Sequence, residues 1–150
     1  MSNIPSNAPY RADIVGSFLR PAELKEARKQ FTEGKTDRRQ LKAVEDRLIT
    51  DLIAKQKAHG LKVITDGEFR RSYWHLDFMW GFNGIEEIEL EHGYQFHGEE
   101  TTPGSIRLTG RISGENHPFV EHFRFVKQFE EEGITARQTL PAPAQLLAEL

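Results

Sequence analysis

The amino-acid sequence predicts an α/β fold built on a parallel sheet, and the order of its apolar segments is the main reason. Short apolar runs at 12–17 and 61–65 are typical of buried strands, and two segments with helical spacing lie between them. A further helix at 118–133 precedes a third predicted strand at 134–140. Strands that alternate with helices in this way favour parallel pairing. The segment at about 85–113 interrupts the order, because its apolar residues alternate with a period of two.

Helix-start and helix-stop signals mark both helices between the first two strands. Pro21 suits the first turn of a helix, and Gly34 ends the apolar face that follows it. The second helix is expected to begin near Thr36 or Asp37 and to end at Gly60, since glycine is common just after a helix. Its predicted buried stripe recurs at intervals of three and four residues and comprises Leu41, Val44, Leu48 and Leu52.

Three further segments complete the predicted order. Residues 72–83 carry two Trp, one Tyr and two Phe, which is more typical of a packed segment than of a loose loop. Residues 85–113 are predicted to form antiparallel strands inserted into the α/β pattern. A last helix is expected from residue 144, and its apolar stripe is still open at Leu150. The sequence is therefore expected to be the opening part of a larger α/β protein, incomplete at its C-terminus.

Composition excludes several classes of protein and of site. The 150 residues include no cysteine, which excludes disulfides, thiolate metal ligands and a cysteine nucleophile. No apolar run approaches the roughly 18 residues that span a bilayer, and the first residues lack the pattern of a signal peptide. We therefore expect a cytoplasmic protein without a membrane partner.

The charges are divided unevenly along the chain. Residues 1–75 hold 15 basic and 10 acidic side chains, a net charge of +5, whereas residues 76–150 hold 5 and 13, a net charge of −8. A nucleic-acid partner requires a concentrated basic patch. The basic residues here are spread along predicted helices among acidic ones, so no nucleic-acid partner is expected.

Candidate binding residues follow two of the predicted strands. The first strand ends at Val15, Gly16 and Ser17, and the second is followed by Asp66-Gly67-Glu68. Ligands of parallel α/β proteins bind at the carboxyl ends of strands. A glycine there lets the backbone approach a ligand, a serine offers a hydroxyl and an N–H to an anionic group, and a carboxylate suits an ammonium group. Together they could clamp an amino acid by both charges, although Gly-Ser turns and Asp-Gly-Glu loops also occur without any such role.

Three motifs along the chain carry a resemblance to an enzyme family. They are Asp13-Ile-Val-Gly-Ser-Phe-Leu-Arg-Pro21, Ile64-Thr-Asp-Gly-Glu-Phe-Arg-Arg71 and Thr139-Leu-Pro-Ala-Pro143. In this order they resemble the catalytic barrel of cobalamin-independent methionine synthase, and most of all its shorter single-barrel homologues. Trp74-His-Leu-Asp-Phe78 and Leu108-Thr-Gly-Arg-Ile-Ser113 are also similar to those homologues. The resemblance runs from about residue 11 to the end of the chain.

The resemblance implies a fold and a reaction. The fold is a (β/α)8 TIM barrel, of which residues 11–150 would be the first part, after a lead-in at 1–10. The reaction is transfer of a methyl group from 5-methyltetrahydrofolate, in its polyglutamate form, to the zinc-bound thiol of homocysteine, giving methionine without cobalamin. Zinc would convert the weakly nucleophilic thiol to a thiolate near neutral pH.

The resemblance also implies roles for four residues. By motif match, Val15, Gly16 and Ser17 would hold homocysteine, with Ser17 on its carboxylate, and Glu68 would meet its amino group. Val15 departs from the family motif, which has Ile at that place. The zinc ligands of the family, His, Cys, Glu and Cys, belong to later strands. No catalytic or metal-ligating residue is therefore expected within this cysteine-free chain.

The remaining conspicuous side chains are expected to be structural. His75 is expected to pack or to cap a helix, and Trp74 and Trp80 to lie in the core or at the mouth of the barrel rather than to stack on a pterin ring. Asp66 is expected to fix its loop through hydrogen bonds to the backbone. The arginines near the motifs are expected to be solvated rather than to attract a polyglutamate tail: Arg20, Arg70 and Arg71.

Two alternative functions remain open from the sequence. The first is another thiol alkyltransferase on the same barrel, because the choice of acceptor would depend on strands that the chain lacks. The second is a stand-alone α+β binding module in which residues 85–113 form the recognition surface. Nothing in the sequence indicates the oligomeric state.

Overall fold

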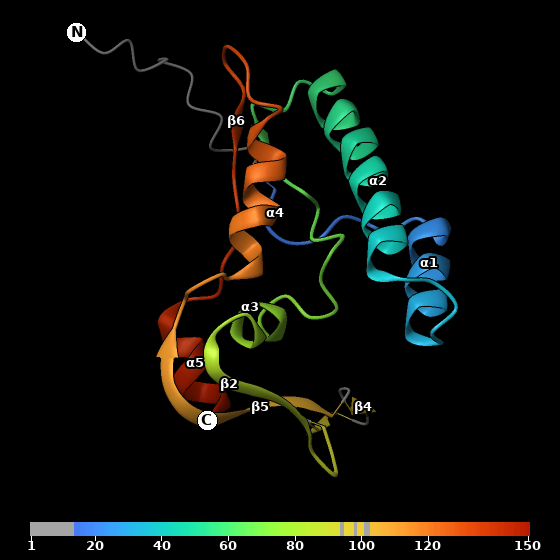
Figure 1. The fold of residues 1–150 in the computed structure, drawn as a ribbon. Helices are drawn as coiled ribbons and strands as arrows, with labels where there is room; N and C mark the ends of the chain where they lie inside the picture. The colour runs from blue at the N-terminus through green and yellow to red at the C-terminus, as the bar shows by residue number, and fades with distance from the viewer. Residues whose placement is uncertain (1–13, 94, 98, 101–102) are drawn as a thin grey trace, which may run out of the picture. The chain divides into compact units, whose positions relative to one another are not determined.

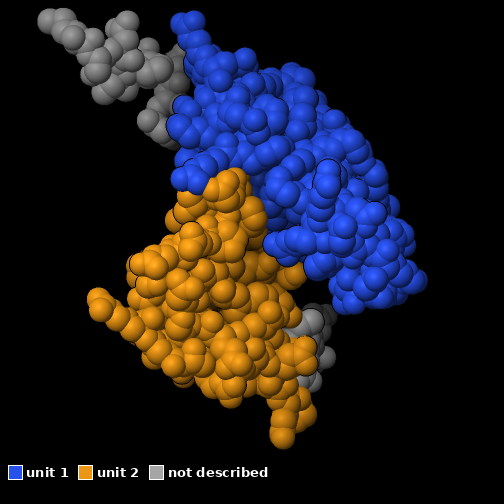
Figure 2. All heavy atoms as spheres, viewed as in Figure 1, with its two compact units in different colours: residues 1–70, 123–139 blue, residues 71–122, 140–150 orange. Residues whose placement is uncertain are grey.

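The computed structural model describes residues 14–93, 95–97, 99–100 and 103–150, and these ranges contain five helices and six strands (Figure 1). The chain divides into two compact units: unit 1 comprises residues 1–70 and 123–139, and unit 2 comprises residues 71–122 and 140–150 (Figure 2). The predicted lead-in at 1–10 and the start of the first predicted strand lie outside the described residues. Within those residues, no helix combines the length and the apolar character required to cross a membrane.

Unit 1 begins with two helices that pack on each other, α1 (Ala22–Thr32) and α2 (Arg38–Ala58) (Figure 1). Asp37 caps α2 in a reciprocal arrangement with Gln40. Asp37 Oδ1 accepts a hydrogen bond from Gln40 N at 2.7 Å, and Asp37 N donates to Gln40 Oε1 at 2.9 Å. These bonds satisfy backbone donors that the start of a helix leaves without a partner. The predicted start of the second helix is therefore confirmed.

The predicted parallel pairing is also confirmed, although the strands are short. β1 (Val63–Ile64) pairs in parallel with β6 (Thr135–Ala136). Beyond the pair, Arg137 N donates to Ile64 O at 2.9 Å. Because the two strands run in the same direction, the residues that follow each of them meet at one edge of the sheet. This edge carries the candidate site.

The prediction of a strand at 12–17 is wrong for its described part. Residues 14–17 have no strand conformation, and Val15 is 88% exposed. The segment joins unit 1 through Phe18 instead, whose N–H donates to Gly67 O at 3.1 Å and whose ring packs on the core. A strand requires repeated backbone pairing with a neighbour. In the ranges that the structure describes, β1 has β6 as its neighbour in the sheet, and residues 14–17 do not join them.

Helices and the β1–β6 pair enclose the hydrophobic core of unit 1. Burial of such apolar surface is the dominant favourable term in folding. The buried members come from α1, α2, both strands, the loop after β1 and α4 (Pro118–Lys127): Leu24, Leu48, Ile49, Ile53, Ile64, Phe69, Val126 and Ala136.

The buried face of α2 includes two polar residues that the apolar stripe did not predict. The Gln56 side chain forms two hydrogen bonds to the backbone of Thr65, the residue after β1: Nε2 donates to Thr65 O at 2.9 Å, and Oε1 accepts from Thr65 N at 3.0 Å. Glu45 Oε2 lies 3.1 Å from Arg70 Nη1. Burial raises the pKa of Glu45, against the opposing effect of the positive charges of Arg70 and Arg28. Both buried polar groups are thus explained by tertiary partners.

Unit 2 contains the antiparallel segment that the sequence predicts. β2 (Asn83–Glu89) pairs antiparallel with β5 (Gly104–Ser113). Between them in the chain, β3 (Gln95–Phe96) pairs antiparallel with β4 (Glu99–Glu100). These strands form sheets separate from the β1–β6 pair (Figure 1). Tyr94, within the segment 85–113 that is predicted to form antiparallel strands, lies outside the described residues.

A register shift at the start of β2 requires a glycine. The shift lies between Asn83 and Ile85, where the residue between them is Gly84 at φ +83°. A Cβ on Gly84 would lie 2.5 Å from the carbonyl oxygen of Arg111. Both the left-handed backbone and this close approach exclude a side chain.

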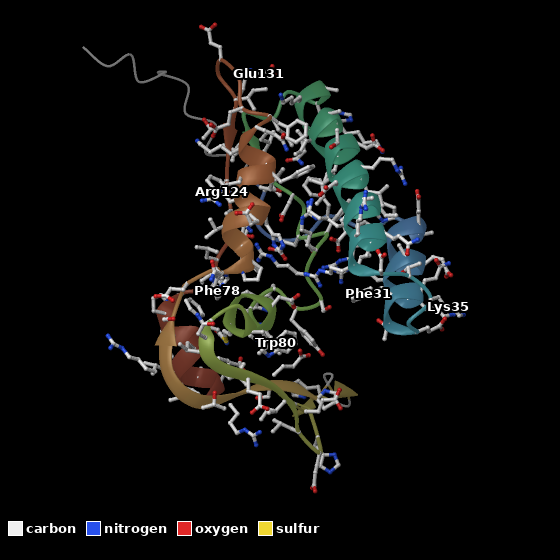
Figure 3. All side chains as sticks on the ribbon, viewed as in Figure 1. Phe31, Lys35, Phe78, Trp80, Arg124 and Glu131 are labelled. Carbon is white, nitrogen blue, oxygen red and sulfur yellow. The ribbon has the colours of Figure 1, made fainter. Side chains whose placement is uncertain are left out.

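The aromatic segment 72–83 forms α3 (Leu76–Trp80) and packs on the β2–β5 hairpin. Trp80, labelled in Figure 3, donates from Nε1 to Ser105 O at 3.0 Å. Trp80 is partly buried and packs against the hydrophobic cluster of unit 2, which agrees with the expected core packing. The buried members of this cluster are Leu76, Met79 and Ile106. Partly buried side chains pack against it, among them Leu146 of α5 (Pro143–Glu149): Tyr73, Trp80, Ile85 and Leu146.

Candidate functional site

Glu68 lies in the loop that follows β1, and its side chain is buried. It is 5% exposed. Thr139 Oγ1 donates to Glu68 Oε1 at 2.8 Å. Thr139 follows β6, so the parallel pairing of β1 with β6 explains how two residues 71 positions apart meet. A buried carboxylate attracts a cationic group, so Glu68 is a candidate contact for the cationic part of a ligand.

The backbone of Glu68 is held in an uncommon conformation. Its φ is +58°, a region that non-glycine residues seldom adopt. Asp66 Oδ1 accepts a hydrogen bond from Glu68 N at 2.9 Å, and Arg20 Nη2 donates to Glu68 O at 3.2 Å. The predicted role of Asp66 is therefore confirmed. Residues held in such conformations are frequent at functional sites, where the surrounding structure fixes them.

The segment that carries Gly16 and Ser17 lies against this loop. Phe18 N donates to Gly67 O, and the guanidinium of Arg20 reaches the carbonyl of Glu68. The two segments that the sequence predicts as halves of one binding site are therefore adjacent in unit 1.

The three residues predicted at the first strand end differ in their environment. Gly16 has φ +96°, and a Cβ there would meet no atom within 4 Å. The backbone conformation, rather than crowding by the protein, therefore favours glycine at this position. Val15 and Ser17 are both exposed.

Unsatisfied polar atoms lie in the two segments that follow β1 and β6. In the part of the chain that the structure describes, Asp66 Oδ2 and both amide atoms of Gln138 are buried without a hydrogen-bond partner. Ile64 of β1 pairs with Ala136 of β6. Asp66 lies two residues after Ile64, and Gln138 lies two residues after Ala136. Buried polar groups are ordinarily hydrogen-bonded, so such atoms mark a place for a ligand or for ordered water.

The prediction that Arg70 and Arg71 are solvated is wrong. The Arg70 side chain is 4% exposed and forms ion pairs with Glu45 and Asp46 of α2. Arg71 is buried as well, with its guanidinium over the Phe119 ring at 4.5 Å from the ring centroid. Sequence reasoning missed both because their partners lie on segments distant in the chain. These arginines are structural cations rather than surface charges.

His75 and Trp74 belong to unit 2. His75 occupies the cap position of α3 without a side-chain capping bond, and its Nε2 lies 3.1 Å from Glu149 Oε1. The expectation of a packed histidine is confirmed by its contact with the Trp74 ring at 4.6 Å between centroids. Trp74 is 52% exposed and is therefore not a core residue.

The residues that the structure describes do not fit a zinc site. A structural or catalytic zinc ion requires three or four His, Cys, Asp or Glu ligands around one point. Across the described ranges, no group of three or more such residues is placed to hold a metal ion. The sequence contains no cysteine, so the thiolate ligands that the resemblance implies are absent from it.

Comparison with known proteins identifies sequence relatives. Residues 11–104 match the family described as cobalamin-independent synthase, catalytic domain. The uncharacterized proteins YxjH and YxjG of Bacillus subtilis (strain 168) are 42% identical over 139 residues and 41% identical over 138 residues. The alignments cover 93% and 92% of this chain, but 37% and 36% of the relatives. The chain thus spans little more than a third of their length.

Solved structures show the same fold. A Listeria monocytogenes protein, provisionally assigned as a vitamin-B12-independent methionine synthase, superimposes with a TM-score of 0.76 at 40% identity, covering 95% of this chain and 39% of that one. A B12-independent methionine synthase from Shewanella sp. W3-18-1, in complex with selenomethionine, gives a TM-score of 0.59 at 18% identity, covering 77% and 33%. The second similarity bears on the fold alone.

Proposed function

Because the chain belongs to the family of cobalamin-independent synthase catalytic domains, we propose that it supplies the acceptor-binding part of a methyltransferase. The reaction proposed for the complete protein moves a methyl group from 5-methyltetrahydrofolate polyglutamate to the thiol of homocysteine, giving methionine. We further propose that residues 11–150 form the first part of a (β/α)8 barrel, in which β1 and β6 are two of the parallel strands. The β2–β5 hairpin would be an insertion in that barrel.

The observation that carries this proposal is the buried carboxylate of Glu68 beside the segment of Gly16 and Ser17. In the proposed complex, Glu68 accepts hydrogen bonds from the ammonium of homocysteine. Val15, Gly16 and Ser17 contact its amino-acid end, and the Ser17 hydroxyl and N–H face its carboxylate. A charge-assisted hydrogen bond shielded from water is stronger than one in bulk solvent. Two such contacts fix the direction in which the thiol points, and holding a reactant in one orientation lowers the entropic part of a barrier.

The contribution of this chain is limited to binding and orientation. We propose zinc, and not cobalamin, as the cofactor of the complete protein, with all of its ligands outside residues 1–150. Since the residues described here do not fit the metal, no step of the reaction is assigned to a metal site in this chain.

Glu68→Gln tests the proposal, because it keeps the shape of the side chain and removes its charge. Homocysteine affinity is measured by isothermal titration calorimetry on the complete natural protein that contains residues 1–150. A hydrogen bond to a charged group contributes roughly 1.5–3 kcal/mol, so we expect affinity to fall about ten- to a hundredfold. Metal content should not change.

The matched control is Glu132→Gln, which removes the charge of an exposed glutamate in the same unit. Glu132→Gln should leave the affinity for homocysteine unchanged. Unchanged affinity in Glu68→Gln would show that the clamp is wrong. Equal binding of cysteine and homocysteine by the unmodified protein would instead favour another thiol alkyltransferase on the same fold.

A further inference from the structure

We propose that Thr139 is a positioning residue that directs the Glu68 carboxylate toward the ammonium of the acceptor. The inference rests on the proposed function and deepens it. The motif Thr139-Leu-Pro-Ala-Pro143 stands out in the sequence, yet its residues have no role in the acceptor clamp described above. The 2.8 Å hydrogen bond from Thr139 Oγ1 to Glu68 Oε1 indicates a role for this motif.

The bond restricts the orientation of the Glu68 carboxylate. A free glutamate samples several rotamers, and fixing them on binding costs free energy that weakens affinity. In Glu68 the loop backbone is already held by Asp66 and Arg20. The Thr139 hydroxyl then adds a constraint at the carboxylate itself. A ligand that binds to an oriented carboxylate pays less of this ordering cost.

The chemical type of the donor matters as much as its position. A hydroxyl is an uncharged donor, so this bond supports the buried carboxylate of Glu68 without cancelling its negative charge. The bond from Thr139 itself therefore does not reduce the attraction of the carboxylate for an ammonium group. An acceptor that lacks an ammonium gains nothing from this arrangement, and Thr139 should not affect its binding.

The position of Thr139 is set by the register of the parallel strands. Ile64 pairs with Ala136, and Arg137 N donates to Ile64 O at 2.9 Å just before the segment that carries Thr139. This register brings the segment after β6 beside the loop after β1. The register of the parallel strands therefore determines which residues meet in the contact between Thr139 and Glu68.

The test compares two ligands that differ only in the ammonium. Homocysteine and 4-mercaptobutyrate, its analogue without the amino group, are titrated by calorimetry into the complete natural protein. The variants are Thr139→Val, which removes the hydroxyl at nearly constant shape, and Thr139→Ser, which retains it. Loss of one hydrogen bond should weaken homocysteine binding about three- to tenfold in Thr139→Val. Binding of the analogue should be unchanged, and Thr139→Ser should restore homocysteine affinity.

Two controls separate positioning from structure. Thr135→Val removes the hydroxyl of an exposed threonine in β6 and should change neither affinity. The melting temperature of each variant reports folding, and Thr139→Ala replaces Thr139→Val if the latter does not fold.

The outcomes distinguish this inference from the function on which it rests. Equal weakening of both ligands in Thr139→Val, or no weakening of either, would overturn the role of Thr139. If Glu68→Gln weakens homocysteine while Thr139→Val does not, only the positioning role is wrong. If neither substitution affects homocysteine, the acceptor clamp itself is wrong.

Discussion

The hydroxyl of Thr139 and the carboxylate of Glu68 are joined by a 2.8 Å hydrogen bond across 71 positions of sequence. The bond links the two segments that follow the parallel strands β1 and β6. It places a neutral donor on a buried acid in the loop against which Gly16 and Ser17 lie. A pair of two-residue strands is sufficient to create this contact, because parallel pairing brings the ends of both strands to one edge.

Ser17→Ala should weaken homocysteine binding less than Glu68→Gln does. The substitution removes a hydroxyl, but the backbone N–H of residue 17 remains to face the ligand carboxylate. We expect a loss of about 1 kcal/mol, which is roughly a fivefold weaker affinity by calorimetry. A loss greater than that of Glu68→Gln would contradict the assignment of the stronger contact to the ammonium.

Asp46→Asn should destabilise the protein at neutral pH and have little effect in acid. Burial alone would raise the pKa of Asp46, but hydrogen bonds from Lys42 and Arg70 prevail and hold that pKa below its usual value. A carboxylate with a lowered pKa contributes stability that is fully present above its unfolded pKa and is lost as pH falls through its folded pKa. We expect a cost of about 1 kcal/mol at pH 7 from urea denaturation, shrinking as pH falls below 4.

Asp51→Asn is the matched control on the same helix. Asp51 is exposed and lies 3.8 Å from Arg47 in a surface ion pair, which should contribute little. A pH-independent cost of Asp46→Asn, or an equal cost of Asp51→Asn, would show that the pairing of Asp46 with Arg70 does not stabilise unit 1.

Gly84→Ala should destabilise the β2–β5 hairpin. The residue has φ +83°, and the added Cβ would meet the carbonyl oxygen of Arg111 at 2.5 Å. Strain of this kind costs of order 1–3 kcal/mol, so the melting temperature should fall by several degrees. Gly110→Ala is the control in β5, because a Cβ there meets no atom within 4 Å. Equal melting temperatures for the two variants would refute the requirement for glycine at the register shift.

Residues 1–150 should bind zinc no better than scattered surface histidines allow. The sequence has no cysteine, and in the described ranges no three His, Cys, Asp or Glu side chains converge. Calorimetric titration of the 150-residue chain with zinc should show weak, non-stoichiometric binding. A single sub-micromolar site would place metal ligands in this chain and overturn their assignment to later strands.

Sequence alone determined the features that depend on neighbouring residues. The helix start near Asp37, the period of two in 85–113 and the helical spacing of α2 are local patterns, and the structure contains the predicted helix and antiparallel strands. The motif around Glu68 indicated both the family and a loop at a strand end. Such local patterns can be predicted from the sequence because caps, turns and periodicity arise from contacts within a few residues.

Tertiary structure decided the partners of the buried polar groups. The partners of Glu68, Gln56 and Arg70 come from segments that the local pattern does not connect. The same limit explains the error at 14–17, where apolar residues indicated a strand but the described chain pairs β1 with β6 instead. Periodicity reports which face of a segment is apolar, whereas a buried charge or amide is stable only beside a partner that the folded chain brings to it.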